Sequence, residues 1–392
     1  MLKTDGLRCW AQIDTDAIAH NVKEIQKLVG DTKVMGIVKA NAYGHGALAC
    51  TKALQKAGVD YFGVACLQEA IELREGNIKD PILILGYTPP TCFEILDQLD
   101  LHQSILSYDY AKKMNEWALE NHTKLKGHVK LDTGMNRTGF LYQDGAKEKE
   151  ELLDTWNMPG LQIDGIFSHF PVSDDLEKDS ADFTRHQMDL FDEAIEEIKK
   201  AGYHPGLRHI QNSYGILNYQ DRGYDYCRPG LLYMGVTSDD SVPILSNPDF
   251  IPILSLKAKV SMVKTIPQGA TVSYGRHFKA KKPTKIASLT IGYADGLPRI
   301  CSNQDLKVLI RGHLVPIVGN ICMDQCMADI SGFDDIKEGD IVTLIGEDQG
   351  TTVTLDTITR LAHTINNETL TSITSRVERF DLAALNDQEK DI

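Results

Sequence analysis

The chain has 392 residues, of which 42% are hydrophobic and 24% charged, and 41 basic against 55 acidic side chains give a formal net charge of −14. This length predicts two domains, because single hydrophobic cores stop growing at about 250 to 300 residues. The acidic balance would repel a phosphate backbone, and no basic patch in the sequence offsets it. We therefore do not expect nucleic acid as a partner.

The sequence gives no sign of a membrane or secreted protein. No apolar run approaches the roughly 20 residues that a membrane-spanning helix needs, and the opening MLKTDGLRCW lacks a signal-peptide pattern. The eight cysteines are scattered, without Cys-x-x-Cys pairs. This spacing favours reduced thiols over a disulfide framework or a zinc site, so we expect a cytoplasmic protein without a metal.

Taken in chain order, the predicted elements begin with the apolar segment CWAQI at 9–13 and a helical pattern that follows it. From residue 33, short β-rich runs alternate with longer stretches of helical periodicity. The runs begin at residues 33, 61, 81, 102, 127, 162, 207 and 226. Eight alternations predict an α/β fold, a closed (β/α)8 TIM-like barrel, because parallel strands need helical crossovers.

The texture changes after Gly235. A turn-rich linker leads into alternating β-branched segments that glycine and proline separate, interrupted by one helical pattern at 355–365. These features predict a mostly β C-terminal domain. We expect the barrel to span 14–240 and the β-rich domain 241–392, the latter joined by the N-terminal strand within 1–13.

Several polar residues fall where predicted barrel strands end, the edge at which such barrels carry out chemistry. In chain order they are Lys39 after the first strand, Arg137 after the fifth, His169 ending the sixth, Asn212 and Ser213 ending the seventh, and Arg228 in the eighth, followed by Gly230. Any one of them is more often structural than functional. Their convergence on one rim favours a site.

This combination suits pyridoxal phosphate (PLP). Ser213 and the backbone amides near Gly230 and Leu231 would form a small anion site at the late strands, where such barrels commonly hold phosphate. Lys39 would hold the cofactor through a Schiff base. No carboxylate is an obvious partner for the pyridine nitrogen, and Arg228 could take that place.

Eight segments, in order, resemble the motifs of the alanine racemase family: VKANAYGHG, KLDTGMNRTG, FSHF, QNSYG, RPGLLYMG, VSYGRHF, IGYADGLPR and GNICMDQ. The resemblance implies a PLP barrel followed by a β domain, in a homodimer whose active site is shared between subunits. It also implies an amino-acid racemase, an isomerase that supplies D-amino acids for peptidoglycan precursors.

The resemblance also assigns roles to individual residues. Racemisation needs acid/base groups on both faces of a planar carbanion, and these are expected to be Lys39 and, from the partner subunit, Tyr274. The other implied roles are Tyr43 and Ser213 at the phosphate with the Gly230 and Leu231 amides, His169 near the cofactor ring, Arg228 at the pyridine nitrogen, and Arg137, Met323, Asp324 and Tyr293 near the substrate. Lys130 corresponds to a lysine that is carbamylated in many members.

One segment departs from the family pattern. Where the family usually has Asn-Tyr-Glu, this chain has TINNE, so Asn367 stands in place of the tyrosine. Asparagine is smaller and offers both a donor and an acceptor, which could admit and hold the hydroxymethyl group of serine. The substitution resembles the serine racemases of vancomycin-resistance clusters. We therefore expect an alanine/serine racemase that favours serine; drift at a tolerant site would instead leave a strict alanine racemase.

Two other classes of protein remain open. A PLP-dependent decarboxylase could share the architecture, but its expected glycine-rich phosphate motif and cysteine-aspartate motif are absent. A PLP-binding homeostasis protein would need only the barrel, so the long β domain with Tyr274 argues against it.

Overall fold

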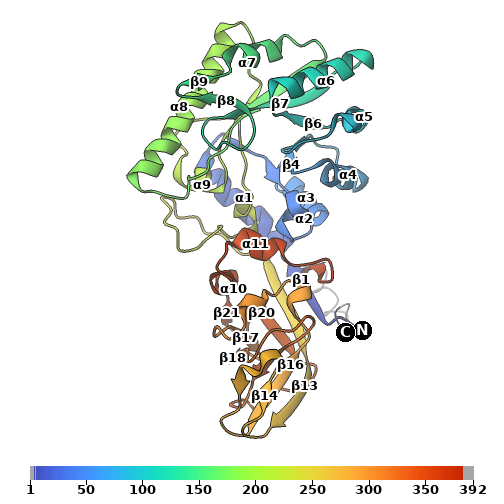
Figure 1. The fold of residues 1–392 in the computed structure, drawn as a ribbon, viewed down its shortest axis with the longest axis vertical. Helices are drawn as coiled ribbons and strands as arrows, with labels where there is room; N and C mark the ends of the chain where they lie inside the picture. Colours follow the sequence, from blue (N-terminus) through green and yellow to red (C-terminus); the bar gives the residue numbers. More distant parts are fainter. Residues whose placement is uncertain (1–3, 5, 383–392) are drawn as a thin grey trace.

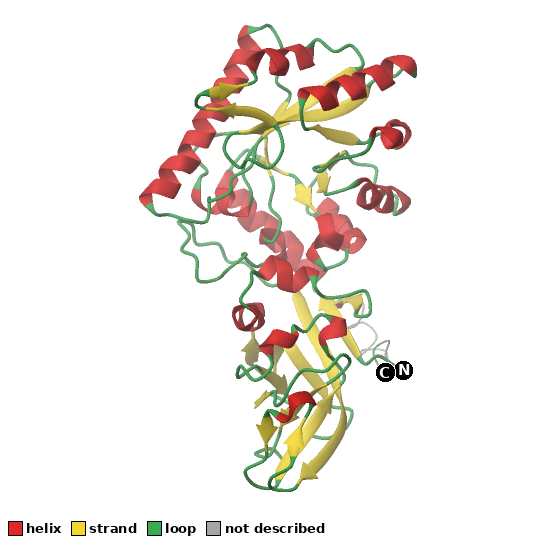
Figure 2. Ribbon diagram, viewed as in Figure 1, coloured by secondary structure: helices red, strands yellow, loops and turns green. Residues whose placement is uncertain are grey.

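The computed structural model describes residue 4 and residues 6–382. A barrel of strands and helices forms one end of the molecule and a β-rich part forms the other (Figure 1). Helices surround the strands of the barrel, whereas long strands dominate the other end (Figure 2). The fold expected from the sequence, a TIM-like barrel followed by a mostly β domain, is confirmed.

The barrel strands are parallel neighbours along the chain. They are β2 (Lys33–Val34), β3 (Gly36–Ile37), β4 (Phe62–Val64), β5 (Ile82–Ile84), β6 (His102–Ile105), β7 (Leu125–Asp132), β10 (Leu161–Phe167), β11 (Leu207–His209) and β12 (Tyr226–Cys227). The barrel closes through two contacts. β12 pairs with β2, and Asp225 N, just before β12, donates to Arg208 O of β11 at 2.9 Å. Strands such as β5 are buried throughout, as expected of a parallel sheet covered on both faces.

Some strands end earlier than the sequence indicates. β11 stops at His209 and β12 at Cys227, so Asn212 and Arg228 lie in the loops that follow rather than in the strands. The sequence pattern predicts no strand over 140–147. In the structure, β8 (Phe140–Gln143) and β9 (Ala146–Lys147) form a hairpin there, beside β7. Beyond the last hydrogen bonds between strands, the backbone is no longer held in the sheet. Asn212 and Arg228 can therefore lie over the barrel mouth.

The helices of the barrel part cover the strands. They are α1 (Thr15–Val29), α2 (Lys39–Tyr43), α3 (Ala47–Lys56), α4 (Leu67–Glu75), α5 (Phe93–Gln98), α6 (Tyr108–Glu120), α7 (Lys149–Trp156), α8 (Lys178–Lys200) and α9 (Ser213–Asn218). In α1, the Asp14 side chain caps the first turn by accepting from Ala17 N at 3.1 Å. Its buried face repeats at helical spacing through Ile18, Val22 and Ile25.

The β-rich part is built on one long central strand. Its strands are β1 (Cys9–Ile13), β13 (Leu254–Ile266), β14 (Thr271–Val272), β15 (Phe278–Lys279), β16 (Thr284–Leu289), β17 (Lys307–Ile310), β18 (His313–Pro316), β19 (Cys326–Asp329), β20 (Ile341–Asp348), β21 (Thr351–Val353) and β22 (Glu378–Asp381). β13 pairs with β1, β16 and β20, all antiparallel. The N-terminal strand therefore belongs to this sheet, while the boundary at residue 240 stays a prediction.

The helix expected over 355–365 is two helices in the structure. α10 (Leu355–Ala362) ends because His363 adopts a left-handed conformation, with φ of 55°. α11 (Asn366–Thr371) then starts in a new direction, at the junction with the barrel (Figure 1). This change of direction carries Asn367 toward the barrel mouth.

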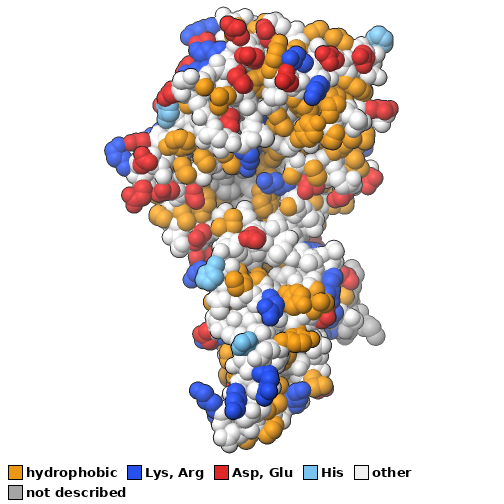
Figure 3. Space-filling model, in the orientation of Figure 1, with side chains coloured by type: hydrophobic (Ala, Val, Ile, Leu, Met, Phe, Trp, Pro, Cys, Tyr) orange, Lys and Arg blue, Asp and Glu red, His pale blue; other side chains and the backbone are white. Residues whose placement is uncertain are grey.

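Within the described ranges, no helix is long and apolar enough to cross a membrane. The face of the molecule in Figure 3 carries acidic and basic side chains interspersed over the barrel. At the far end of the β-rich part, basic side chains predominate on this face (Figure 3).

Candidate functional site

A cavity of about 490 Å³ opens where the barrel strands end. Most of the site residues predicted from the sequence line it: Lys39, Tyr43, Lys130, Arg137, His169, Asn212, Ser213, Arg228, Gly230, Leu231 and Asn367. These residues come from loops after separate strands and from α11, far apart in the sequence. The barrel mouth therefore brings two lysine amines, two arginines and a histidine into one cavity.

Lys39 is an amine without a partner. Its Nζ makes no hydrogen bond or ion pair with the described residues, and it lies 5.9 Å from the centroid of the Tyr43 ring. Burial lowers the pKa of Lys39, and the charges of Arg137 and Arg228 lower it further. More of the amine is therefore unprotonated at neutral pH, the state required of a nucleophile or a base.

The loop that carries Lys39 is the short segment labelled α2, which is not a right-handed helix and is strained. Ala40, Asn41, Ala42 and Tyr43 all have φ between 49° and 54°, a left-handed conformation that costs L-residues roughly 1 to 2 kcal/mol each. Glu69 on α4 offsets part of this cost, since its carboxylate accepts from Ala40 N and Ala65 N, both at 2.7 Å. Sequence reasoning missed Glu69, because no local pattern links it to a loop 29 residues away.

A small cradle of polar groups lies in the same cavity. Ser213 Oγ accepts from Gly230 N at 3.2 Å, and the Tyr43 hydroxyl makes no hydrogen bond with the described residues. A side chain on Gly230 would clash with that hydroxyl, since its Cβ would lie 2.5 Å from Tyr43 Oη. Asn212 holds the neighbouring turn, its Oδ1 accepting from Gly215 N at 2.9 Å. The cradle matches an anion the size of a phosphate.

Arg228 projects from the loop after β12 and is fully buried among acceptors. Nη1 donates to the O and Nδ1 of His209, both at 2.8 Å. Nη2 donates to Ser168 O at 2.7 Å, Ile210 O at 3.1 Å and His169 Nδ1 at 3.2 Å. Burial lowers the pKa of Arg228 to about 9, so it stays charged at neutral pH. With both Nη atoms bonded, Nε–H is the donor left for a ligand.

Three further side chains complete the electrostatics of the cavity. Burial lowers the pKa of Lys130 to about 8, assisted by Arg137 and Arg228, while its Nζ donates to Thr138 Oγ1 at 2.6 Å. Burial, and then the charge of Arg228, hold the pKa of His169 well below its usual value, so the imidazole is neutral. Arg137 is exposed on the rim and has no hydrogen bond or ion pair with the described residues.

Asn367 closes the cavity from the α11 side. Its Oδ1 is buried and has no hydrogen-bond partner among the described residues. A buried acceptor without a donor costs about 1 to 3 kcal/mol. Its side chain is nevertheless part of the cavity lining, so a small amide stands at this wall.

The remaining predicted site residues lie elsewhere on this chain. Tyr274, Met323, Asp324 and Tyr293 belong to the β-rich part, and none of them lines the cavity. Tyr274 is 72% exposed and Met323 52%. One chain alone does not bring Tyr274 to Lys39.

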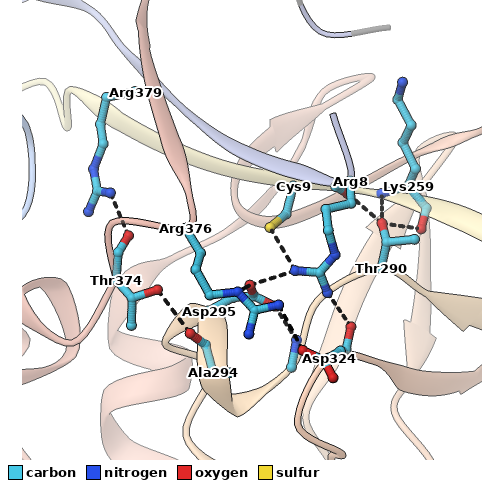
Figure 4. A network of polar contacts seen from close by, with 11 residues as sticks. Arg8, Cys9, Lys259, Thr290, Ala294, Asp295, Asp324, Thr374, Arg376 and Arg379 are labelled. Carbon is cyan, nitrogen blue, oxygen red and sulfur yellow. Dashed lines mark hydrogen bonds and ion pairs between the residues drawn. The ribbon is translucent and has the colours of Figure 1, made fainter. Parts of the chain in front are cut away.

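A polar network holds Asp324, one of these residues, in place (Figure 4). Arg376 donates to Asp324 Oδ1 at 2.7 Å, and Arg8 donates to the Asp324 carbonyl. Both arginines also pair with the buried Asp295, Arg8 at 2.7 Å and Arg376 at 3.4 Å. The turn that presents Met323 is therefore fixed from two sides, rather than being a loose surface loop.

The comparisons with known proteins cover nearly the whole chain. Sequence profiles described as alanine racemase, N-terminal domain, and alanine racemase, C-terminal domain, match residues 13–238 and 253–381. The chain belongs to the alanine racemase family. The relative named alanine racemase 2, from Caldanaerobacter subterraneus subsp. tengcongensis, is 42% identical over 94% of this chain and 93% of its own length.

Solved structures of the family have the same fold. The alanine racemase of Clostridium difficile 630 aligns with a TM-score of 0.88 at 35% identity, covering 95% of each chain. The histidine racemase of Leuconostoc mesenteroides subsp. sake aligns with a TM-score of 0.84 at 25% identity, covering 96% of this chain and 98% of its own. Alanine racemase folds therefore occur in proteins named for different amino acids.

The alanine racemase family is PLP-dependent, and the cavity fits that cofactor. The unpartnered amine of Lys39 suits its carbonyl group, and the cradle of Ser213 and Gly230 suits its phosphate. Nε of Arg228 is the free donor that a pyridine nitrogen could accept from.

Proposed function

We propose that this PLP-dependent racemase interconverts the L and D forms of serine and alanine, using Lys39 and Tyr274 as its two acid/base groups. The racemase class follows from the family, and the small polar side chain of Asn367 in the cavity lining is the observation that extends the proposal to serine. The products would be D-amino acids for peptidoglycan precursors, made in the cytoplasm.

Bound PLP would withdraw electrons from the bonds at the substrate Cα, which makes that C–H acidic. Lys39 would then exchange the proton on one face of the carbon, because burial and two nearby arginines lower its pKa and favour the free amine. Tyr274 would exchange the proton on the opposite face, since a single fixed base returns a proton only to the side it came from.

The other residues would bind and orient. Arg137, free on the rim, would hold the substrate carboxylate, and a guanidinium suits this because it can donate two parallel hydrogen bonds. Arg228 would donate through Nε to the cofactor nitrogen. A charged donor disfavours protonation of that nitrogen, so the ring would withdraw less negative charge from the substrate Cα. Tyr43, Ser213, Gly230 and Leu231 would hold the phosphate, with Asn212 behind them and His169 against the ring.

We further propose that the active form is a homodimer. Tyr274, Met323 and Tyr293 are exposed on a face of the β-rich part that their own cavity does not use. A second copy would present Tyr274 to Lys39 and set Met323, Asp324 and Tyr293 beside the substrate. Carbamylation of Lys130 is a further proposal, supported by the lowered pKa of its amine, because the reaction with carbon dioxide requires the neutral form.

Substrate choice would rest on Asn367. An asparagine amide can both donate to and accept from a serine hydroxyl, and its small side chain leaves room for one. Alanine would still be accepted, because a pocket built around one hydrogen bond does not exclude a smaller side chain. At this position the chain resembles the serine racemases of vancomycin-resistance clusters, which would then accept serine in the same way.

The test is a comparison of kcat/KM for L-serine and L-alanine in three proteins. We expect wild type to favour serine, and Asn367→Tyr to shift the ratio toward alanine at least tenfold, since it replaces the acceptor with bulk. Asn367→Ala is the matched control: it removes the acceptor without adding bulk, so serine alone should suffer. Wild type that favours alanine a hundredfold would contradict the serine proposal and leave a strict alanine racemase, the activity after which the relatives are named.

The same assay separates the remaining classes. Incubation with one enantiomer, followed by chiral analysis, gives the other enantiomer only if the protein is a racemase. Release of carbon dioxide would indicate the decarboxylase, and no change in the amino acid would leave the PLP-binding homeostasis protein.

A further inference from the structure

The barrel interior contains an unbroken chain of polar contacts that the proposed chemistry does not use. It starts at Arg228 and runs through His209, His128, Tyr61 and His102 to Asp164. Most barrels of this type fill this space with branched apolar side chains. Burying so many polar groups costs free energy unless each has a hydrogen-bond partner. A continuous chain of this kind is therefore expected to have a function.

The contacts follow one another without a gap. His209 Nε2 lies 2.8 Å from His128 Nδ1, and His128 Nε2 lies 2.9 Å from the Tyr61 hydroxyl. That hydroxyl bonds His102 Nδ1, and His102 Nε2 lies 3.3 Å from Asp164 Oδ2. The chain thus passes from the cavity at the C-terminal ends of the strands to the opposite end of the barrel.

The direction of every bond is determined by its two ends. Arg228 can only donate, so His209 Nδ1 accepts and the ring's proton lies on Nε2. Burial lowers the pKa of His209 well below its usual value and that of His128 to about 3, so each ring is neutral and carries one proton. His128 must therefore accept at Nδ1 and donate from Nε2.

The same logic continues past the histidines. Tyr61 accepts from His128, so its single proton goes to His102 Nδ1, and the His102 proton then lies on Nε2 facing Asp164. A carboxylate is the natural end of such a chain, because it can only accept. The backbone leaves room for the chain at one point: a Cβ on Gly165 would lie 2.6 Å from His128 Nδ1.

We propose that this directional chain positions Arg228, with Asp164 as its remote anchor. The guanidinium has no carboxylate among its five acceptors, so the aligned dipoles of the chain supply the compensation for its charge. The held guanidinium keeps Nε–H turned toward the cavity. His209, His128, Tyr61, His102 and Asp164 are thus positioning residues. The inference rests on the proposed function, because Arg228 is assigned there to the cofactor nitrogen.

The first experiment measures the tautomers directly. Protein labelled with ¹⁵N-histidine, without cofactor or substrate, is examined by NMR near neutral pH, with His128→Gln and His209→Gln used to assign the two rings. Both rings should be neutral with the proton on Nε2. A proton on Nδ1 of either ring would overturn the proposal. Neither result depends on the amino acid racemised, so failure here is distinct from failure of the proposed function.

The second experiment interrupts the chain. Tyr61→Phe removes the hydroxyl, whereas Tyr226→Phe removes a neighbouring hydroxyl that bonds Asp60 outside the chain and whose ring lies 5.6 Å from that of Tyr61. Tyr61→Phe should shift the His128 ¹⁵N signals and weaken cofactor binding about tenfold, the effect of about one hydrogen bond. It should also lower kcat more than it changes KM. Tyr226→Phe should resemble wild type, and identical behaviour of the two variants would refute the proposal.

A conservative pair tests the anchor. Asp164→Asn retains an oxygen that can accept from His102, whereas Asp164→Leu retains none. Cofactor affinity and the His128 signals should therefore stay near wild type in the first variant and follow Tyr61→Phe in the second. Thermal unfolding of each variant shows whether it is folded, and wild-type histidine signals in folded Asp164→Leu would contradict the role of Asp164.

Discussion

At the scale of single residues, burial decides the charge of the histidines. His45, His128 and His209 are at most 1% exposed. Burial lowers the pKa of His45 to about 4 and that of His128 to about 3, and it holds that of His209 well below the ordinary value. Each ring is therefore neutral in the fold but takes up a proton near pH 6.5 in the unfolded chain.

This difference predicts that acid weakens the fold. Above about pH 6.5 the rings are neutral in both states, and their effect on stability is absent. As the pH falls toward 4, the unfolded state binds protons that the folded state refuses, so the free energy of unfolding falls. The loss between pH 7 and 5.5 is roughly 1 kcal/mol for each ring. Urea unfolding at the two pH values measures it, and His45→Gln should reduce the dependence by one ring's share. An equal dependence in His45→Gln would show that His45 does not contribute.

At the scale of elements, the loop that carries Lys39 depends on a distant helix. Glu69 on α4 bonds two backbone amides, one in this loop and one after β4. We expect Glu69→Ala to lower the free energy of unfolding by about 1 kcal/mol, because two backbone donors, one exposed and one partly buried, lose a charged acceptor. It should also lower kcat at least tenfold, since the left-handed turn then no longer fixes Lys39.

The comparison variant is Glu72→Ala, one turn along the same helix and exposed. It should leave both the urea midpoint and kcat near wild type. If the two variants were equally stable and active, the bonds from Glu69 would not be what holds the loop.

Elements also show where sequence reasoning succeeds. The barrel strands were predictable because short β-rich runs and helical spacing alternate locally, and each signal lies within its own segment. The ends of these strands were not predictable, because β11 and β12 end where the neighbouring strands no longer offer backbone hydrogen bonds. The two-helix segment at 355–371 depends on a left-handed His363, which no apolar spacing reveals.

The same distinction holds for side chains in the site. Lys39, Ser213 and Arg228 were predictable since they follow strands whose ends converge on one rim. The chain from His209 to Asp164 was not, because its members face one another across the barrel from separate strands. Histidine within buried strands, as in GHVKLD, is the one signal that could have indicated it.

At the scale of the whole molecule, the site residues are divided between the barrel and the β-rich part. Lys39 and the cofactor cradle lie in the barrel, whereas Tyr274 and Met323 lie exposed on the β-rich part. Beside Met323, contacts from Arg8 and Arg376 to Asp295 and Asp324 fix the turn within the chain itself (Figure 4). Two copies, each offering its β-rich face to the other's barrel, would form two complete sites by symmetry.

This arrangement predicts that two inactive variants restore activity in each other. Lys39→Ala and Tyr274→Phe should each be almost inactive alone. In a hybrid dimer, one site collects both substitutions and the other has none. Random reassociation makes half of the dimers hybrid, and half of their sites intact, so the mixture should recover about a quarter of wild-type activity. The measurement is turnover after the two purified variants are dissociated together and reassociated. A site built within one chain would recover nothing, because every barrel would still lack one of its own two groups.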